Sequence, residues 1–167
     1  MKRMLVGSLL FIAYVTAAMI PLEWLWFDPG VPSFSDSVVG TDPETHYSRE
    51  IKRVTSISYS VTLRDGLTHD VVCEATGGPF DYLPEKSGPL LNRTLSAFAP
   101  SDPRCAHLPV GVYFGQAVWT AAYPLRAFLP DFLDRPLGWI VPPKTVTRDI
   151  PPFRILPHET KETTLGN

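Results

Sequence analysis

Cys73, Cys105, His69 and His107 are the residues whose side chains and spacing best support chemistry in this sequence. His69 lies four residues before Cys73 and His107 lies two after Cys105, so on strands each pair would occupy one face of a sheet. Thiolate and imidazole are zinc ligands, although these spacings are not those of the usual zinc motifs. An exported hydrolase or metal-binding domain that uses these four residues is therefore the alternative hypothesis.

A disulfide is the simpler interpretation of the two cysteines. They are the only cysteines in the chain, and an oxidising compartment joins an isolated pair of thiols. Such a bond stabilises a small domain by about 3 to 4 kcal/mol, mainly by restricting the unfolded chain. We therefore predict a Cys73–Cys105 disulfide, with no metal and no other cofactor.

The sequence offers little support for catalysis or for nucleic-acid binding. No serine lies in a Gly-x-Ser-x-Gly elbow, and nothing in the sequence pairs Asp131 or Asp134 with a catalytic partner. We therefore predict that the protein is not an enzyme. The 15 basic and 17 acidic residues give a net charge of −2, which disfavours a basic face along a phosphate backbone, so no nucleic-acid partner is predicted.

The first 27 residues have the features of a membrane anchor. Residues 4–22 contain no charged residue, and Lys2 and Arg3 precede them. This is about the length of a membrane-spanning helix, and its basic end predicts a cytoplasmic N-terminus with the rest of the chain exported. Three aromatic residues follow where an interfacial belt would lie on the exported side: Trp24, Trp26 and Phe27.

A cleaved signal peptide is the competing interpretation of this segment. Residues 5–14 form an apolar core, and residues 15–17 offer the small side chains that a signal peptidase prefers. The spanning length and the aromatic belt favour a retained anchor over residues 1–27. We therefore predict a single-pass protein of the cell inner membrane, with the lipid bilayer as one partner and a periplasmic or extracellular C-terminal domain.

Three segments follow the anchor in the predicted organisation. Residues 28–46 are rich in Pro, Gly, Ser and Asp and predict an extended tether. Residues 47–157 predict the folded domain, and residues 158–167 predict a disordered tail. None of the 18 prolines falls between Glu44 and Gly78 or between Val110 and Tyr123, and central strands are expected there because proline cannot donate to a sheet ladder.

The clearest strand signal is a strict alternation of apolar and polar residues over 56–64. One face of this strand carries four apolar side chains: Ile57, Tyr59, Val61 and Leu63. Asp65-Gly66 follows and predicts a hairpin whose three-residue loop pairs Leu63 with Leu67. In that register Cys73 points into the core.

The remaining strands complete a two-sheet β-sandwich. Residues 94–98 predict a short strand, and residues 108–122 predict a central strand covered on both faces. Residues 144–148 and 153–156 predict a last edge strand that is interrupted by prolines.

The segment 108–119, with its Pro-x-Gly-x-Tyr pattern at Pro109, Gly111 and Tyr113, and the later segment 142–147 resemble the closing strands of immunoglobulin-like domains. Small membrane-anchored proteins of proteobacteria and their phages have similar endings. The resemblance covers about a third of the chain. It implies a mainly β, immunoglobulin-like β-sandwich, a fold that mostly mediates adhesion or assembly and has no shared catalytic residues to transfer.

Residues 123–141 form an unusually long and apolar connection. Such long connections are normally either functional or packed against the domain as a lid. In the first case this segment would expose an apolar patch that binds a partner or the membrane interface. In the second case it would cover the end of the sandwich. The predicted contact residues are Phe128, Leu129, Phe132, Leu133 and Trp139. We therefore predict a non-enzymatic membrane protein whose sandwich binds or scaffolds another envelope, virion or membrane-complex component. A further possibility is an accessory subunit that packs through its N-terminal helix against a larger membrane complex.

Overall fold

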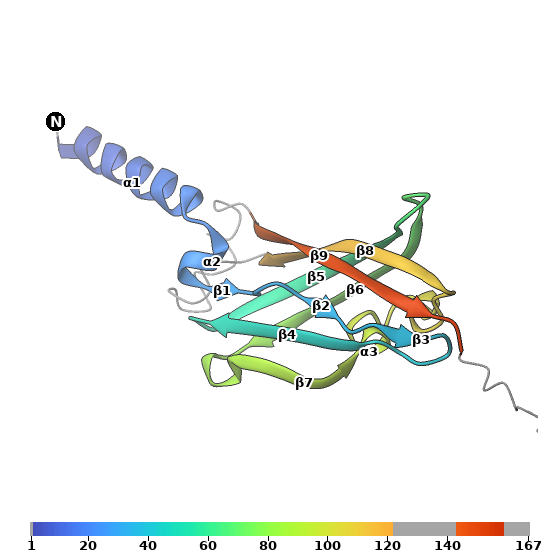
Figure 1. Cartoon of the computed structure of the whole chain (residues 1–167). Coiled ribbons are helices and arrows are strands. Elements are labelled where there is room, and N and C mark those ends of the chain that lie inside the picture. The colour runs from blue at the N-terminus through green and yellow to red at the C-terminus, as the bar shows by residue number, and fades with distance from the viewer. Residues whose placement is uncertain (1, 122–142, 159–167) are drawn as a thin grey trace, which may run out of the picture.

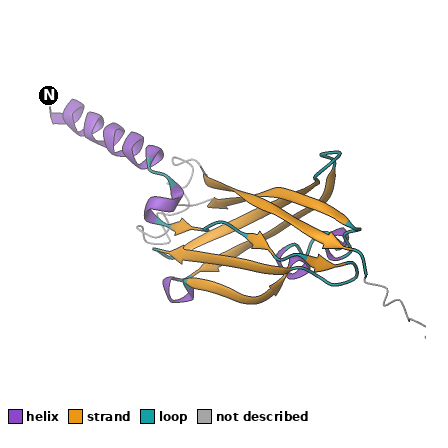
Figure 2. Cartoon of the chain, in the orientation of Figure 1, coloured by secondary structure: helices purple, strands orange, loops and turns teal. Residues whose placement is uncertain are grey.

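Strands make up most of the computed structural model of this chain (Figure 2), which describes residues 2–121 and 143–158. The predicted mainly β fold with two sheets is confirmed. In chain order the elements are α1 (Lys2–Met19), α2 (Leu22–Leu25), β1 (Phe27–Asp28), β2 (Ser33–Phe34), β3 (Ser37–Val38), β4 (Glu44–Ile51), β5 (Thr55–Asp65), β6 (Val71–Tyr82), η1 (Pro84–Lys86), β7 (Gly88–Thr94), α3 (Leu95–Phe98), η2 (Pro103–Ala106), β8 (Gly111–Ala121) and β9 (Lys144–Leu156).

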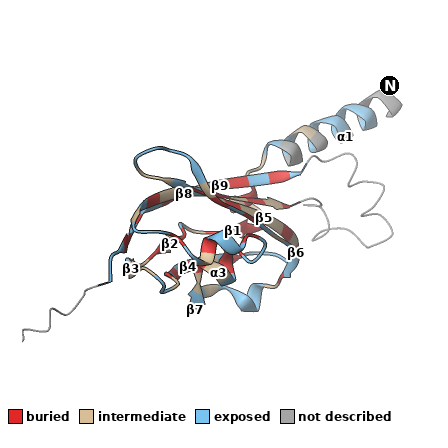
Figure 3. Cartoon of the chain, turned by 90° about the vertical axis from the view of Figure 1, so that its right-hand side faces the viewer, coloured by how far each residue is buried: buried red, intermediate tan, exposed pale blue. Residues whose placement is uncertain are grey.

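The two sheets face each other and enclose the core (Figures 1 and 3). The larger sheet has the strand order β3-β9-β8-β5-β6, in which β3 runs parallel to β9 and the other neighbours are antiparallel. In the smaller sheet, β1 and β2 pair with one side of β4, and β7 pairs with the other. This arrangement makes β6 and β7 the edges of their sheets on the same side of the molecule.

The alternation in β5 positions the centre of the core as predicted. Ile57, Val61 and Leu63 are fully buried, because alternate residues of a strand point to the same face. β8 lies between β5 and β9, as expected for a central strand. Only one of its faces is fully covered, however: Trp119 is buried, whereas Val112 on the opposite face is 43% exposed.

The hairpin between β5 and β6 has a longer loop than the sequence predicts. Leu63 pairs with Cys73 and not with Leu67. The cause lies in the turn, where the Asp65 carboxylate accepts hydrogen bonds from the backbone N–H groups of Leu67 and Thr68 at 2.8 and 2.9 Å. The predicted register is therefore wrong, but the inward direction of Cys73 is confirmed because its side chain is completely buried.

Residues 28–46 are part of the sandwich, so their prediction as a free tether is wrong. β2 and β3 hydrogen-bond to β4 and β9, and the Arg154 N–H donates to the Asp36 carboxylate at 2.7 Å. Phe34 is buried, with its ring centroid 5.2 Å from that of Phe153. The segment has no periodicity that would reveal this packing, because β2 and β3 are only two residues long.

Two of the three aromatic residues predicted for the membrane interface lie in the core of the sandwich. Trp26 and Phe27 are 2% and 0% exposed, whereas Trp24 is 68% exposed. The reason is the pairing of Phe27 with Ile51 at the end of β4, which directs the Phe27 ring between the sheets to 4.9 Å from the ring of Tyr82. The prediction of an interfacial belt is therefore wrong for Trp26 and Phe27.

Two further elements differ from their predicted form. The segment expected as a short strand at 94–98 forms the helical turn α3, and a strand precedes it as β7. β9 is one continuous strand that passes through Pro151 and Pro152. It is not an edge along its whole length, because β3 pairs with its last residues at Ile155 and Leu156.

Helix α1 projects away from both sheets (Figures 1 and 3). None of the helices in the described part of the chain has both the length and the apolar character needed to cross a membrane. The apolar residues of α1 that are 57% to 76% exposed are Val6, Leu9, Leu10, Phe11, Ile12 and Met19.

The burial of Phe27 predicts a large difference between neighbouring aromatic residues. Replacing Phe27 by alanine should lower the free energy of unfolding by about 3 to 5 kcal/mol, because a large core side chain is removed and a cavity remains. Replacing the exposed Trp24 by alanine should change it by less than about 0.5 kcal/mol. Urea unfolding of the detergent-solubilised protein, followed by circular dichroism, measures both; equal effects would show that 27–28 is not part of the folded unit.

Candidate functional site

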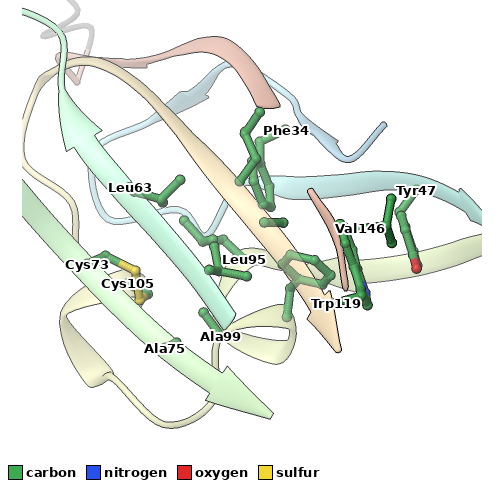
Figure 4. Packing of buried hydrophobic residues seen from close by; sticks show 14 of the residues in the cluster. Phe34, Tyr47, Leu63, Cys73, Ala75, Leu95, Ala99, Cys105, Trp119 and Val146 are labelled. Carbon is green, nitrogen blue, oxygen red and sulfur yellow. A yellow bond between two sulfur atoms is a disulfide. The ribbon is translucent and has the colours of Figure 1, made fainter. Parts of the chain in front are cut away.

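Cys73 of β6 and Cys105 of η2 form a disulfide in the core (Figure 4), which confirms the predicted pair. Their Cα atoms are 5.2 Å apart. Among the described residues, Asp102 is the one acidic or histidine side chain with a possible metal-ligand atom within 4.8 Å of both sulfurs. His69 and His107 are exposed. With both sulfurs in the disulfide, the thiolate ligands of the alternative four-residue metal set are not available.

Asp102 fastens the segment around η2 to β6. Its carboxylate accepts hydrogen bonds from the backbone N–H groups of Glu74 and Arg104, each at 3.0 Å, and from the Arg104 Nη2 atom at 2.7 Å. The Arg104 guanidinium, followed by the Glu74 N–H group, holds the pKa of this carboxyl well below its ordinary value. The sequence offered no signal for this contact, since Asp102 and Glu74 meet only in the folded chain.

A cleft of about 420 Å³ lies between the two sheets on the side where β6 and β7 form their edges. Its lining comes from β4, β5, β6, β7, β8, α3 and η1. Six of the lining side chains are aromatic: Tyr47, Tyr59, Phe80, Tyr82, Phe98 and Trp119. This size and this apolar, aromatic lining are typical of small-molecule sites.

The aromatic rings form the inner walls of the cleft. Tyr47 stacks on Trp119, with ring centroids 5.8 Å apart and an interplanar angle of 4°; both rings belong to the buried cluster in Figure 4. Tyr59 packs against Phe98 at 5.4 Å and against Phe80 at 6.2 Å. The Tyr59 hydroxyl donates to the Phe98 carbonyl oxygen at 2.8 Å, which fixes this wall in place.

Positively charged side chains lie around the cleft. Arg49, Lys86 and Arg93 contribute to the lining, together with one acidic residue, Asp81. Arg49 is held in position, because its Nε atom donates to the Lys86 carbonyl oxygen at 3.2 Å and its Cζ atom lies 4.9 Å from the centroid of the Tyr82 ring. The lining thus has more positive than negative charge in a chain whose net charge is −2.

Two hydroxyl groups of the lining are buried without a partner. Thr45 and Tyr47 are 3% and 4% exposed, and neither hydroxyl has a hydrogen-bond partner among the described residues. Burial raises the pKa of the Tyr47 phenol far above its ordinary value, so this group stays neutral. A buried polar group without a partner costs free energy, so both hydroxyls lower the stability of the fold.

Sequence reasoning missed this cleft. The alternation of Thr45, Tyr47 and Arg49 in β4 would have placed these side chains on one face, but the other walls come from distant parts of the chain. The five contact residues predicted between Phe128 and Trp139 lie outside the described residues, so they stay a prediction.

No protein-family model matches the chain, and comparisons with characterised proteins and with solved structures find no match. What the cleft can bind is therefore inferred from the chemistry of its own lining residues.

The two tyrosine hydroxyls of the cleft should respond in opposite ways to removal. Tyr47→Phe deletes a buried hydroxyl without a partner, so the free energy of unfolding should stay within about 0.5 kcal/mol or rise. Tyr59→Phe removes a 2.8 Å hydrogen bond and should lower it by about 1 to 2 kcal/mol. Urea unfolding of the two variants in parallel is the measurement; a clear loss in Tyr47→Phe would mean that its hydroxyl has a partner in the folded protein.

The depressed pKa of Asp102 predicts a pH dependence of stability. The ionised carboxylate stabilises the fold fully above its unfolded pKa of about 3.9, and this contribution is lost as the pH falls towards the lower folded pKa. Asp102→Asn should therefore be less stable than the wild type at pH 7, and the difference should shrink steadily below pH 4. Urea unfolding from pH 7 to pH 2 tests this, and a difference that is constant with pH would contradict it.

Proposed function

We propose that this chain is a non-enzymatic membrane protein in which α1 holds an exported β-sandwich at the bilayer, where the sandwich binds or scaffolds another envelope or membrane-complex component. The exposed apolar surface of α1 carries this proposal. Six large apolar side chains of this helix are more than half exposed, while the helix projects away from the core (Figure 1). Contiguous apolar surface of this kind marks a contact with lipid or with another protein.

The dimensions of α1 are compatible with a place in the bilayer. Its 18 residues give a length of about 27 Å at 1.5 Å per residue, against a hydrocarbon core of about 30 Å. Local thinning of the bilayer or the contribution of flanking residues compensates for a mismatch of this size. Lys2 and Arg3 at its start favour a cytoplasmic N-terminus.

The disulfide supports export of the sandwich. Such bonds persist in oxidising compartments outside the cytoplasm, and here the bond joins β6 to η2 inside the core. Compartment and orientation therefore agree: the basic N-terminus favours export of the residues after α1, and the disulfide is typical of exported domains.

Two local features support an immunoglobulin-like sandwich as the fold of the exported domain. The Tyr113 hydroxyl at the start of β8 donates to the Pro109 carbonyl oxygen at 2.8 Å, which resembles the tyrosine corner of that fold. The short strand β3 pairs in parallel with the last strand, β9, while β2 pairs with β4 in the other sheet. Sandwiches of this type mostly act by binding, which favours a binding role over catalysis.

Charged residues in α1 should release the protein from membranes. Leu10→Asp combined with Phe11→Asp should cost about 5 to 7 kcal/mol of membrane insertion free energy, so most of the chain should move from the membrane pellet to the soluble fraction. The matched control is Leu67→Asp, a leucine that is 91% exposed in the β5–β6 loop, which should stay in the pellet. Membrane fractionation after alkaline extraction measures both, and retention of the double variant would refute attachment through α1.

A further inference from the structure

We propose that the cleft between β6 and β7 is a binding site for a small organic anion with a flat, apolar ring body. Two properties of the lining select this class of ligand: its aromatic walls and its excess of positive charge among the described residues. The inference does not depend on how the chain is attached to a membrane, because no described side chain of α1 belongs to the lining.

The walls select a flat body. The cleft volume of about 420 Å³ falls within the range of small-molecule sites, about 300 to 1,000 Å³. Tyr59, Phe80 and Phe98 pack together in one aromatic wall of the cleft, and ring–ring contacts are more favourable than area burial alone. An apolar ring system can pack against this wall, whereas a bare inorganic anion would leave it in contact with water.

The charge selects an anion. Among the described lining residues, Arg49, Lys86 and Arg93 contribute three positive charges and Asp81 contributes one negative charge. Arginine and lysine bind carboxylate, sulfonate and phosphate oxygens through charge-assisted hydrogen bonds. Because the whole chain has a net charge of −2, this local excess is not a property of the whole surface.

Two fluorescent probes that share one ring system test the proposal. 8-Anilinonaphthalene-1-sulfonate has a flat apolar body, an amine and one negative charge, and N-phenyl-1-naphthylamine lacks only the sulfonate. Both are titrated into the full-length protein in detergent, with detergent alone as background. We expect one saturable site per chain for the sulfonate, with weaker binding of the neutral probe.

Three variants separate the cleft from the rest of the surface. Ala97→Trp fills the cleft from an exposed position of α3 and should abolish saturable binding of both probes. Lys86→Glu combined with Arg93→Glu should weaken binding of the sulfonate at least fivefold and change that of the neutral probe less than twofold. Arg154→Glu, an exposed arginine outside the cleft, is the matched control and should leave both affinities unchanged.

Either of two results would overturn the proposal. One is binding of both probes to a folded Ala97→Trp variant with wild-type affinity, because the site would then lie elsewhere, for example on α1. The other is an equal response of the sulfonate to the double variant and to Arg154→Glu, because the cleft would then not recognise charge. Cooperative thermal unfolding identifies folded variants, and the double variant decides the question if Ala97→Trp does not fold, since Lys86 and Arg93 are exposed.

Discussion

The stacking of Tyr47 on Trp119 joins the two sheets, and much of the remaining structure depends on it. Tyr47 comes from β4 in the smaller sheet, and Trp119 comes from β8 at the centre of the larger sheet. Two parallel rings are wide and rigid, so they set the distance between the sheets. On one side Phe27 closes the space against Trp119; on the other, where β6 and β7 are the edges, the same spacing leaves a cleft.

The features that were predictable from the sequence are those encoded within a few residues of one another. The alternation of apolar and polar residues in β5 predicts that Ile57 and Val61 point into the core. The disulfide partners are predictable because the chain has only two cysteines. The sequence predicts the turn after Asp65 but not the length of its loop. The Asp65 side chain accepts two backbone hydrogen bonds and so stabilises a longer loop than the Asp-Gly pair suggests.

The features that were not predictable depend on contacts between distant segments. Residues 28–46 look like a tether by composition, but their backbone groups find partners on β4 and β9. Trp26 and Phe27 follow an apolar helix, as interfacial residues do, yet both are buried in the core, Phe27 through its strand pairing with Ile51. The cleft combines side chains from seven elements, so no local pattern could reveal it. That the Thr45 and Tyr47 hydroxyls have no hydrogen-bond partner among the described residues is likewise visible only in the folded structure.

The join between α1 and the sandwich also determines how far the domain can travel. A free tether over residues 28–46 would allow excursions of roughly 25 Å. Instead, only Ile20 and Pro21 separate the end of α1 from α2, whose Leu22 is already buried in the core. With α1 held in a bilayer, the sandwich can tilt but cannot diffuse away from the lipid surface. For a chain anchored as proposed, any molecule that the sandwich captures must therefore arrive within a thin layer above the membrane.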